Sequence, residues 1–275
     1  MSGQTVAVSI EMGDGRPAYF DISPNQHAPA CFALSVRKSG SSIFSSMTQA
    51  LAEFNGVNTV DIPGKMFDGG YRYPDWNGHP RITGLLWRGN AYIGFRDAPT
   101  GMYDDPVFKE GRKILVVRDP RDALVSEYFS NAYSHSVPTQ NAGNSVVEQE
   151  RKRALSVTIE EYAMKRVVQL DRTVTAYDGL IGDPHLLVVR YEDVIFGKAN
   201  WLKQIASHFG WTTSDELIQN ILSWADVRPD EENPTAFVRR VAPGDHLDKL
   251  SPKAIKRISN QLSAIWQDLG YDVRG

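Results

Sequence analysis

Cysteine is almost absent from this 275-residue chain, which contains Cys31 alone. A single cysteine excludes a disulfide bond within the chain and a metal cluster built from cysteines, and it is typical of a reducing compartment. Because Cys31 lies in a short apolar run, we predict that it is a small core residue and not a nucleophile.

Long hydrophobic runs are also missing, and none approaches the roughly 18 residues that suggest a transmembrane helix. The sequence therefore predicts no membrane span. The first residues lack the basic segment and apolar stretch of a secretory signal, so we predict a cytoplasmic protein. The net charge of −3 does not predict a general nucleic-acid-binding surface.

What the chain does contain is an alternation of apolar strands and amphipathic helices. Buried strands are predicted at residues 31–36 and 90–95, in the segment that begins at Lys113, and at residues 185–193. This alternation predicts a single α/β domain whose central parallel sheet has helices on both faces. We expect residues 1–30 to form an extended lead-in, residues 31–275 the domain, residues 62–90 a long loop, and residues 252–269 one final helix.

The segment Arg-Lys-Ser-Gly-Ser-Ser at residues 37–42 lies between a predicted strand and a predicted helix. Such a loop offers unpaired backbone N–H groups and a partial positive charge to an anion. Lys38 adds a charge, Gly40 permits close approach, and serine hydroxyls add donors, which together suit a phosphate. The segment is not a Walker A motif, because its lysine precedes its glycine and the upstream glycine is absent. Taken alone, it also fits a plain polar turn.

A second loop has a similar character. Arg118 follows a predicted strand, and Ser126 lies about two turns into the next helix, so a guanidinium and a hydroxyl could share one anion. A structural ion-pair cluster of Arg118 with Asp119 and Asp122 is the alternative.

Taken together, the two loops resemble the cofactor-binding signature of sulfotransferases that use 3′-phosphoadenosine 5′-phosphosulfate (PAPS). Three further segments match this family in order, namely residues 188–193, 221–227 and 237–245, so the resemblance spans residues 31–270. It implies a P-loop-NTPase-like fold and transfer of a sulfuryl group from PAPS to an acceptor hydroxyl or amine. It also implies release of adenosine 3′,5′-bisphosphate without a metal.

The resemblance implies a role for each matching residue. Lys38 would act in catalysis, and with Ser39, Gly40, Ser41 and Ser42 it would hold the 5′-phosphosulfate. The implied 3′-phosphate ligands are Arg118, Ser126, Arg239 and Arg240. Tyr191 and Trp224 would contact the adenosine. The alternatives are a solvated surface pair for Arg239 and Arg240, and core packing for Trp224.

The family commonly places a catalytic histidine where this chain has Asp97. We therefore predict Asp97 as the base, with a turn cap paired with Arg96 as its alternative and His79 and His135 as other candidate bases. Two other functions stay open, a P-loop kinase or NTPase and a non-catalytic nucleotide-binding relative. The acceptor, a small molecule or a glycan, and the oligomeric state are not determined by the sequence.

Overall fold

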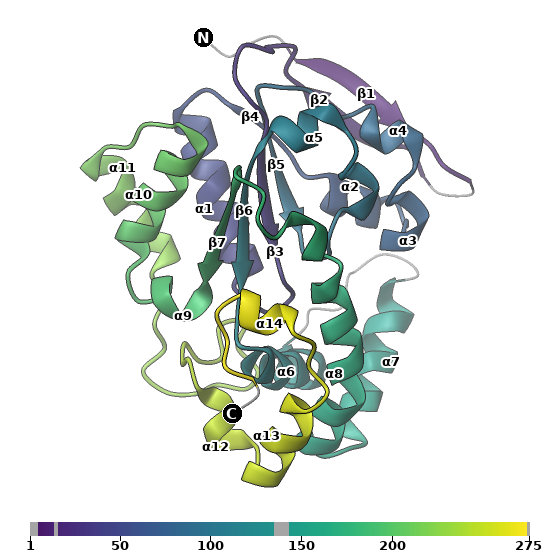
Figure 1. The fold of residues 1–275 in the computed structure, drawn as a ribbon, viewed down its shortest axis with the longest axis vertical. Helices are drawn as coiled ribbons and strands as arrows, with labels where there is room; N and C mark the ends of the chain where they lie inside the picture. Colours follow the sequence, from purple (N-terminus) through teal and green to yellow (C-terminus); the bar gives the residue numbers. More distant parts are fainter. Residues whose placement is uncertain (1–4, 14–15, 135–142, 274–275) are drawn as a thin grey trace. The chain divides into compact units, whose positions relative to one another are not determined.

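The computed structural model describes residues 5–13, 16–134 and 143–273. Its contacts divide the chain into two compact units (Figure 1). We call residues 1–117 and 179–226 the sheet unit, and residues 118–178 and 227–275 the helical unit. Each unit is described by itself.

Among the described residues, five parallel strands form the main sheet, in the order β4-β5-β3-β6-β7. Their bounds are β3 Cys31–Ser35, β4 Asn58–Val60, β5 Asn90–Phe95, β6 Arg112–Val117 and β7 Leu186–Arg190. Figure 1 shows β3 at the centre of this sheet. The predicted strands and their parallel arrangement are confirmed. The three-residue β4 was not predicted, because so short a strand shows no periodicity.

Both faces of the sheet are apolar. On one face, α1 (Ser41–Phe54), α10 (Lys198–Phe209) and α11 (Asp215–Ala225) pack on the strands, and Phe44 stacks on Trp201 with ring centroids 5.7 Å apart. On the other face, Phe32 stacks on Tyr92 at 4.9 Å and contacts Phe108 of α5 (Pro106–Glu110) at 4.7 Å. The predicted α/β class, with helices on both faces of a parallel sheet, is therefore confirmed.

Cys31 belongs to the first of these packed faces. Its side chain is 3% exposed, and burial raises the pKa of the thiol to about 12. The prediction of a core residue is confirmed.

Short helices occupy the region that the sequence predicted as a long loop, so that prediction is wrong. They are α2 Ile62–Asp68, α3 Tyr73–Trp76 and α4 Pro80–Thr83. Each has a proline in its first turn, and the Asp61 side chain caps α2 by accepting from the Gly64 N–H. Proline therefore marks helix starts here, and Gly69 and Gly84 mark the ends of α2 and α4. This unit also contains η1 Thr100–Met102 and α9 Tyr191–Val194.

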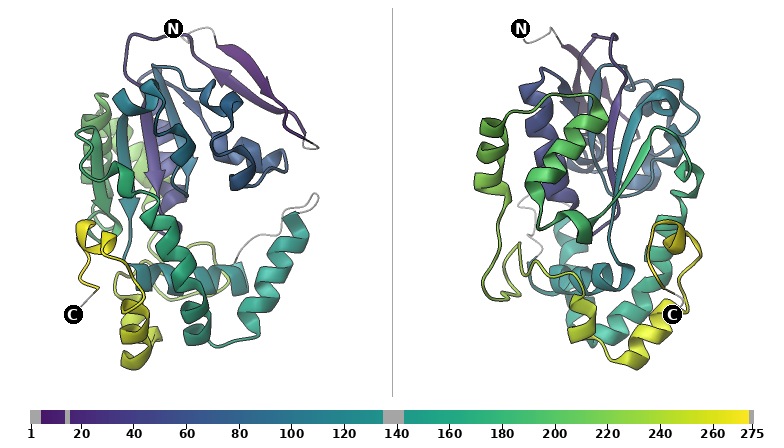
Figure 2. Two further views of the ribbon diagram at one scale, coloured as in Figure 1. Left: turned by 45° about the vertical axis from the view of Figure 1, so that its right-hand side comes forward. Right: turned by 60° about the vertical axis from the view of Figure 1, so that its left-hand side comes forward.

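Within the predicted lead-in, β1 (Val6–Ile10) and β2 (Ala18–Ile22) pair as an antiparallel hairpin. Side-chain amides tie the hairpin to the main sheet: Ser23 N–H donates to Asn90 at 2.9 Å, and Asn58 donates to the Asp21 carbonyl at 2.8 Å. Figure 2 shows the hairpin at the end of the sheet unit where β5 begins.

The helical unit is built around α6 and α8. Its elements are α6 Pro120–Phe129, the π-helix η2 Ser130–Ser134, α7 Gly143–Leu155, α8 Ile159–Thr175, α12 Asp245–Lys249, α13 Pro252–Ser259 and α14 Ile265–Asp268. A short turn, η3 Asp178–Leu180, contains the point where the chain passes to the sheet unit. Thr158 and Glu161 form the capping box of α8.

The predicted final helix is wrong, because the chain leaves the helix after α13 and resumes it in α14. Asp171 of α8 accounts for the break. Its carboxylate accepts from the Ser263 N–H and hydroxyl, at 2.8 and 2.9 Å, and from the Trp266 indole at 2.9 Å. These long-range contacts override a helical apolar pattern. None of the described helices has the length and apolar character needed to cross a membrane.

Candidate active site

The loop between β3 and α1 has an unusual backbone. Lys38 and Gly40 both adopt the left-handed conformation, with φ of 65° and 82°. A lysine rarely adopts this conformation, and such strain is found most often where a loop serves a function. In the described chain no side chain caps the start of α1, and its first turn contains no acidic residue. The loop therefore directs the positive end of a 14-residue helix toward the carboxyl edge of the sheet.

Tyr191 packs against this loop. It begins α9, directly after β7, and is 5% exposed. A Cβ atom on Gly40 would lie 3.1 and 3.2 Å from the Tyr191 ring carbons Cδ2 and Cε2. Glycine is therefore required at position 40 for two reasons: its φ is positive, and a Cβ atom would crowd the Tyr191 ring. The predicted adenosine contact of Tyr191 stays a prediction.

The serine hydroxyls of the loop have different surroundings. Ser39 is fully buried, and its hydroxyl donates to the carbonyls of Val36 at 2.6 Å and Val116 at 3.0 Å. Ser39 thus fixes the loop to β6. The Ser42 hydroxyl accepts from Arg96 at 3.2 Å, while Ser41 is buried at the first position of α1.

Asp97 follows β5 and is held by Arg37. Arg37 Nε donates to Oδ1 at 3.1 Å and Nη2 donates to Oδ2 at 2.7 Å, so both carboxylate oxygens are engaged. The Asp97 side chain is 19% exposed, against 53% for Arg37. Arg37 is therefore the ion-pair partner of Asp97. The alternative interpretation, a turn cap, had assigned Arg96 as that partner. Burial, together with the charge of Arg37, lowers the pKa of Arg96.

The other candidate bases have different positions. The His79 Nδ1 atom accepts from the Arg81 N–H at 3.2 Å and so caps α4. His135 lies outside the described residues. Near Asp97, the Tyr73 hydroxyl donates to the Ala98 carbonyl. Burial, and to a smaller extent the charge of Asp97, raise the pKa of Tyr73.

The sheet unit thus brings three segments together at the carboxyl edge: the loop of residues 37–42, Arg96 with Asp97, and Tyr191. Arg37 and Arg96 were not predicted as site residues. Their position directly before Lys38 and Asp97 is the signal that could have found them.

Trp224, near the end of α11, is 42% exposed, so its indole is not packed in the core.

In the helical unit, Asp122 of α6 is the central acceptor. It is fully buried and accepts from the Gly244 N–H at 2.7 Å, the His246 N–H at 2.9 Å and His246 Nδ1 at 2.7 Å. Arg118, 6% exposed, lies 3.7 Å away. Burial disfavours the carboxylate, but the His246 hydrogen bond and the Arg118 charge outweigh it and lower the pKa of Asp122.

Arg239 and Arg240 join the same network. Arg239 pairs with Glu232 and Asp245, and its guanidinium lies over the Phe129 ring, 4.2 Å from the centroid. Arg240 donates to Asp245 at 3.0 Å and to Asp248 at 3.1 Å. The two arginines are therefore ordered by carboxylates and are not a simple solvated pair.

These contacts bring Arg118, Arg239 and Arg240 into one network, because Asp122 binds both Arg118 and the backbone beside Asp245. Ser126 lies on α6 within this unit and is partly exposed. The sequence analysis missed Asp245 and His246 as supporting residues. Asp122 was considered only as an ion-pair partner of Arg118.

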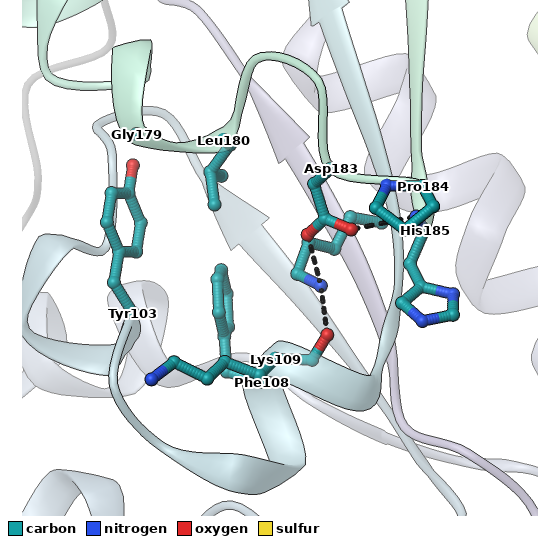
Figure 3. Close-up of a pocket in the computed structure, with 9 residues that line it drawn as sticks. Tyr103, Phe108, Lys109, Gly179, Leu180, Asp183, Pro184 and His185 are labelled. Atoms are coloured by element: carbon teal, nitrogen blue, oxygen red, sulfur yellow. Dashed lines mark hydrogen bonds and ion pairs between the residues drawn. The ribbon is translucent and has the colours of Figure 1, made fainter.

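A separate pocket of about 370 Å³ opens at the amino ends of β6 and β7 (Figure 3). Tyr103, Phe108, Leu180 and Pro184 form its apolar walls. The buried Lys113 beside it pairs with Asp183 at 3.0 Å and donates to the carbonyls of Lys109 and Gly111. Because β6 is parallel to β3, this pocket lies at the opposite edge of the sheet from the loop of residues 37–42.

A parallel α/β sheet with a loop that leads into a helix start at its carboxyl edge is typical of proteins that bind phosphorylated ligands. The family model of the sulfotransferase domain matches residues 104–260, more than half of the chain. The chain therefore belongs to the sulfotransferase family, which confirms the resemblance seen in the sequence. The match includes residues of both units.

A solved structure of a mouse sulfotransferase agrees on the fold. The mouse sulfotransferase SULT7A1, complexed with PAP, is similar with a TM-score of 0.59 and 13% identity, over 91% of this chain and 86% of that chain. A sulfotransferase from Alicyclobacillus acidocaldarius gives a TM-score of 0.49 and 12% identity, over 88% and 94%. No curated protein matches in sequence. The P-loop-like fold is confirmed, and a sulfotransferase is favoured over a kinase.

Proposed function

We propose that this sulfotransferase moves a sulfuryl group from PAPS to an acceptor hydroxyl or amine and releases adenosine 3′,5′-bisphosphate. The observation that carries the proposal is the loop of residues 37–42. Left-handed residues, a lysine and an uncapped helix start are combined there, in a chain that belongs to the sulfotransferase family. These are the groups that a 5′-phosphosulfate needs.

The residues present fit PAPS in both units. In the sheet unit, Lys38, Gly40, Ser41 and Ser42 would bind the phosphosulfate, with Ser39 fixing the loop through its two carbonyl contacts. In the helical unit, Arg118, Ser126, Arg239 and Arg240 would bind the 3′-phosphate. Guanidinium groups that carboxylates already orient need little reorganisation to meet a dianion.

PAPS when bound supplies the sulfuryl group and a leaving phosphate on whose oxygen negative charge grows. Lys38 would offset that charge, together with the backbone N–H groups at the start of α1. The exposed Trp224 indole would offer a flat apolar face for the adenine. Tyr191, whose ring lies beside Gly40, would shape the loop near the adenosine. Asp97 would accept the acceptor's proton.

Other features follow from the same proposal. Residues 31–275 would form the domain, and charge neutralisation by lysine and arginine would make a metal unnecessary. The acceptor would be a small molecule or a glycan that reaches the carboxyl edge of the sheet. We expect a cytoplasmic protein that does not bind nucleic acid.

The test is thermal stabilisation of the purified protein without added metal. Adenosine 3′,5′-bisphosphate at 100 times its dissociation constant should stabilise the fold by about 2.7 kcal/mol, whereas ADP should not. Arg118→Ala should reduce the shift strongly, and Arg88→Ala, which removes an exposed arginine paired with Glu110, should leave it unchanged. A larger shift with ATP and magnesium than with the bisphosphate would contradict the proposal.

A further inference from the structure

The ion pair between Arg37 and Asp97 joins two of the three segments of the site in the sheet unit. Arg37 immediately precedes Lys38 in the loop, and Asp97 immediately follows Arg96 at the end of β5. Both nitrogens of the fork donate, at 3.1 and 2.7 Å, one to each carboxylate oxygen. Two parallel hydrogen bonds fix the plane of a carboxylate, which one bond does not do.

We propose that Arg37 is a positioning residue, which orients the Asp97 carboxylate for the acceptor and links that base to the loop. The inference rests on the proposed function, and it adds a role for a residue that the family signature does not assign. A carboxylate oxygen can accept more than one hydrogen bond, so the fork leaves acceptor capacity for the incoming hydroxyl. The 19% exposure of Asp97 leaves that capacity within reach.

The surroundings of the pair favour positioning over direct binding of the phosphosulfate by Arg37. Arg37 Nε and Nη2 are directed at Asp97, while Lys38 and the start of α1 provide the positive charge of the loop. On the other side, the Tyr73 hydroxyl donates to the carbonyl of Ala98, the next residue after Asp97. Asp97 is thus fixed by its side chain through Arg37 and by its neighbouring backbone through Tyr73.

The experiment is a double-mutant cycle with Arg37→Ala, Asp97→Asn and the combined variant, with Arg37→Lys as a second test of the fork. Transfer from PAPS would be measured with 2-naphthol, hexanol and glucosamine as probe acceptors. Binding of adenosine 3′,5′-bisphosphate would be measured by calorimetry. Arg88→Ala is the matched control, because it also breaks an arginine–carboxylate pair in the same unit.

We expect Arg37→Ala to lower kcat by about 10- to 100-fold, since a misplaced reacting group can cost that much. Arg37→Lys should lose most of the same factor, because an ammonium group does not replace a planar fork. The KM for PAPS and the bisphosphate affinity should change by less than about twofold. In the Asp97→Asn background, Arg37→Ala should have almost no further effect, because the two residues act as one unit.

Three results would overturn the inference. Additive effects of the two substitutions would mean that Arg37 does not act through Asp97. Weaker bisphosphate binding by Arg37→Ala would make Arg37 a ligand of the cofactor. Equal kcat for the wild type and Asp97→Asn on a probe that is sulfated would mean that Asp97 is not the base, and would leave no base for Arg37 to position. Absence of bisphosphate binding by the wild type would instead refute the PAPS proposal itself, so the two failures are distinguishable.

Discussion

Lys38 combines a strained backbone with the positive charge that the reaction would use. A left-handed conformation costs an L-residue roughly 1–2 kcal/mol, whereas glycine adopts it freely at a smaller entropic cost. At Gly40, which also has a positive φ, the residue is a glycine with the Tyr191 ring beside it, whereas Lys38 adopts the same conformation with a Cβ atom. We therefore expect stability and function to respond in opposite directions at position 38.

Lys38→Gly should raise the free energy of unfolding by about 0.5–1 kcal/mol, because the strain is removed. The same variant should lose transfer by about 100-fold, as when one charge-stabilising donor is removed. Urea unfolding and a transfer assay measure the two effects. Lys38→Met, which keeps the strain and loses the charge, is the control and should lose activity without gaining stability. Full activity in either variant would argue against a catalytic role of Lys38.

Gly40→Ala should destabilise the protein by more than the left-handed backbone alone explains, because the new Cβ would meet the Tyr191 ring at 3.1 Å. Gly56→Ala is the matched control, since Gly56 also has a positive φ, of 64°, but has open space around it. We expect about 1–2 kcal/mol for Gly56→Ala and a larger loss for Gly40→Ala in urea unfolding. Equal losses would mean that the loop moves away from Tyr191 without cost.

Helix α6 and the segment that leads into α12 depend on one carboxylate, Asp122. The groups around it are His246, the Gly244 backbone and Arg118, so the acid and its partners are all within the helical unit. The pKa of Asp122 is lowered, which means that folding favours its charged form. A carboxyl group with a lowered folded pKa stabilises the fold above its unfolded pKa, and this stabilisation is lost as the pH falls through the folded value.

Asp122→Asn should therefore lower the free energy of unfolding by roughly 2 kcal/mol near neutral pH, the scale of hydrogen bonds to a buried charge. The difference from the wild type should shrink below about pH 4, where the unfolded carboxyl is protonated. Urea unfolding of both proteins, from neutral pH to below about pH 4, measures this difference in the free energy of unfolding. Asp104→Asn, which changes a fully exposed carboxylate, should show no such dependence. A difference that stays constant with pH would contradict the role of the Asp122 charge.

The proposed PAPS ligands would neutralise the phosphates with protein cations, namely Lys38 for the phosphosulfate and Arg118, Arg239 and Arg240 for the 3′-phosphate. Kinases with P-loops use magnesium for this purpose. We therefore expect EDTA to leave transfer from PAPS unchanged within about twofold, in an assay that follows adenosine 3′,5′-bisphosphate. ATP turnover that requires magnesium would contradict this expectation and restore the kinase alternative.

Many elements were predictable because their signals are local. Apolar runs located β3, β5, β6 and β7, and a capping box located the start of α8. The hairpin β1–β2 and the short helices of residues 62–83 were missed, since each is stabilised by contacts with distant residues or by caps within a proline-rich segment. The break between α13 and α14 was missed for the same reason, because Asp171 lies about ninety residues away from Ser263.

The sequence by itself determined the α/β class and the parallel sheet, and it contained the motifs whose resemblance pointed to the sulfotransferases. Those properties follow from the periodicity of apolar residues along the chain and from motifs whose residues are close together in the sequence. Only the tertiary structure decided that Arg37, and not Arg96, holds Asp97, and that Asp122 links Arg118 to Arg239 and Arg240. The Arg37–Asp97 pair and the contact of His246 with Asp122 join residues 60 and 124 positions apart. A side chain's partner is chosen by distance and direction in space, which no local pattern in the chain encodes.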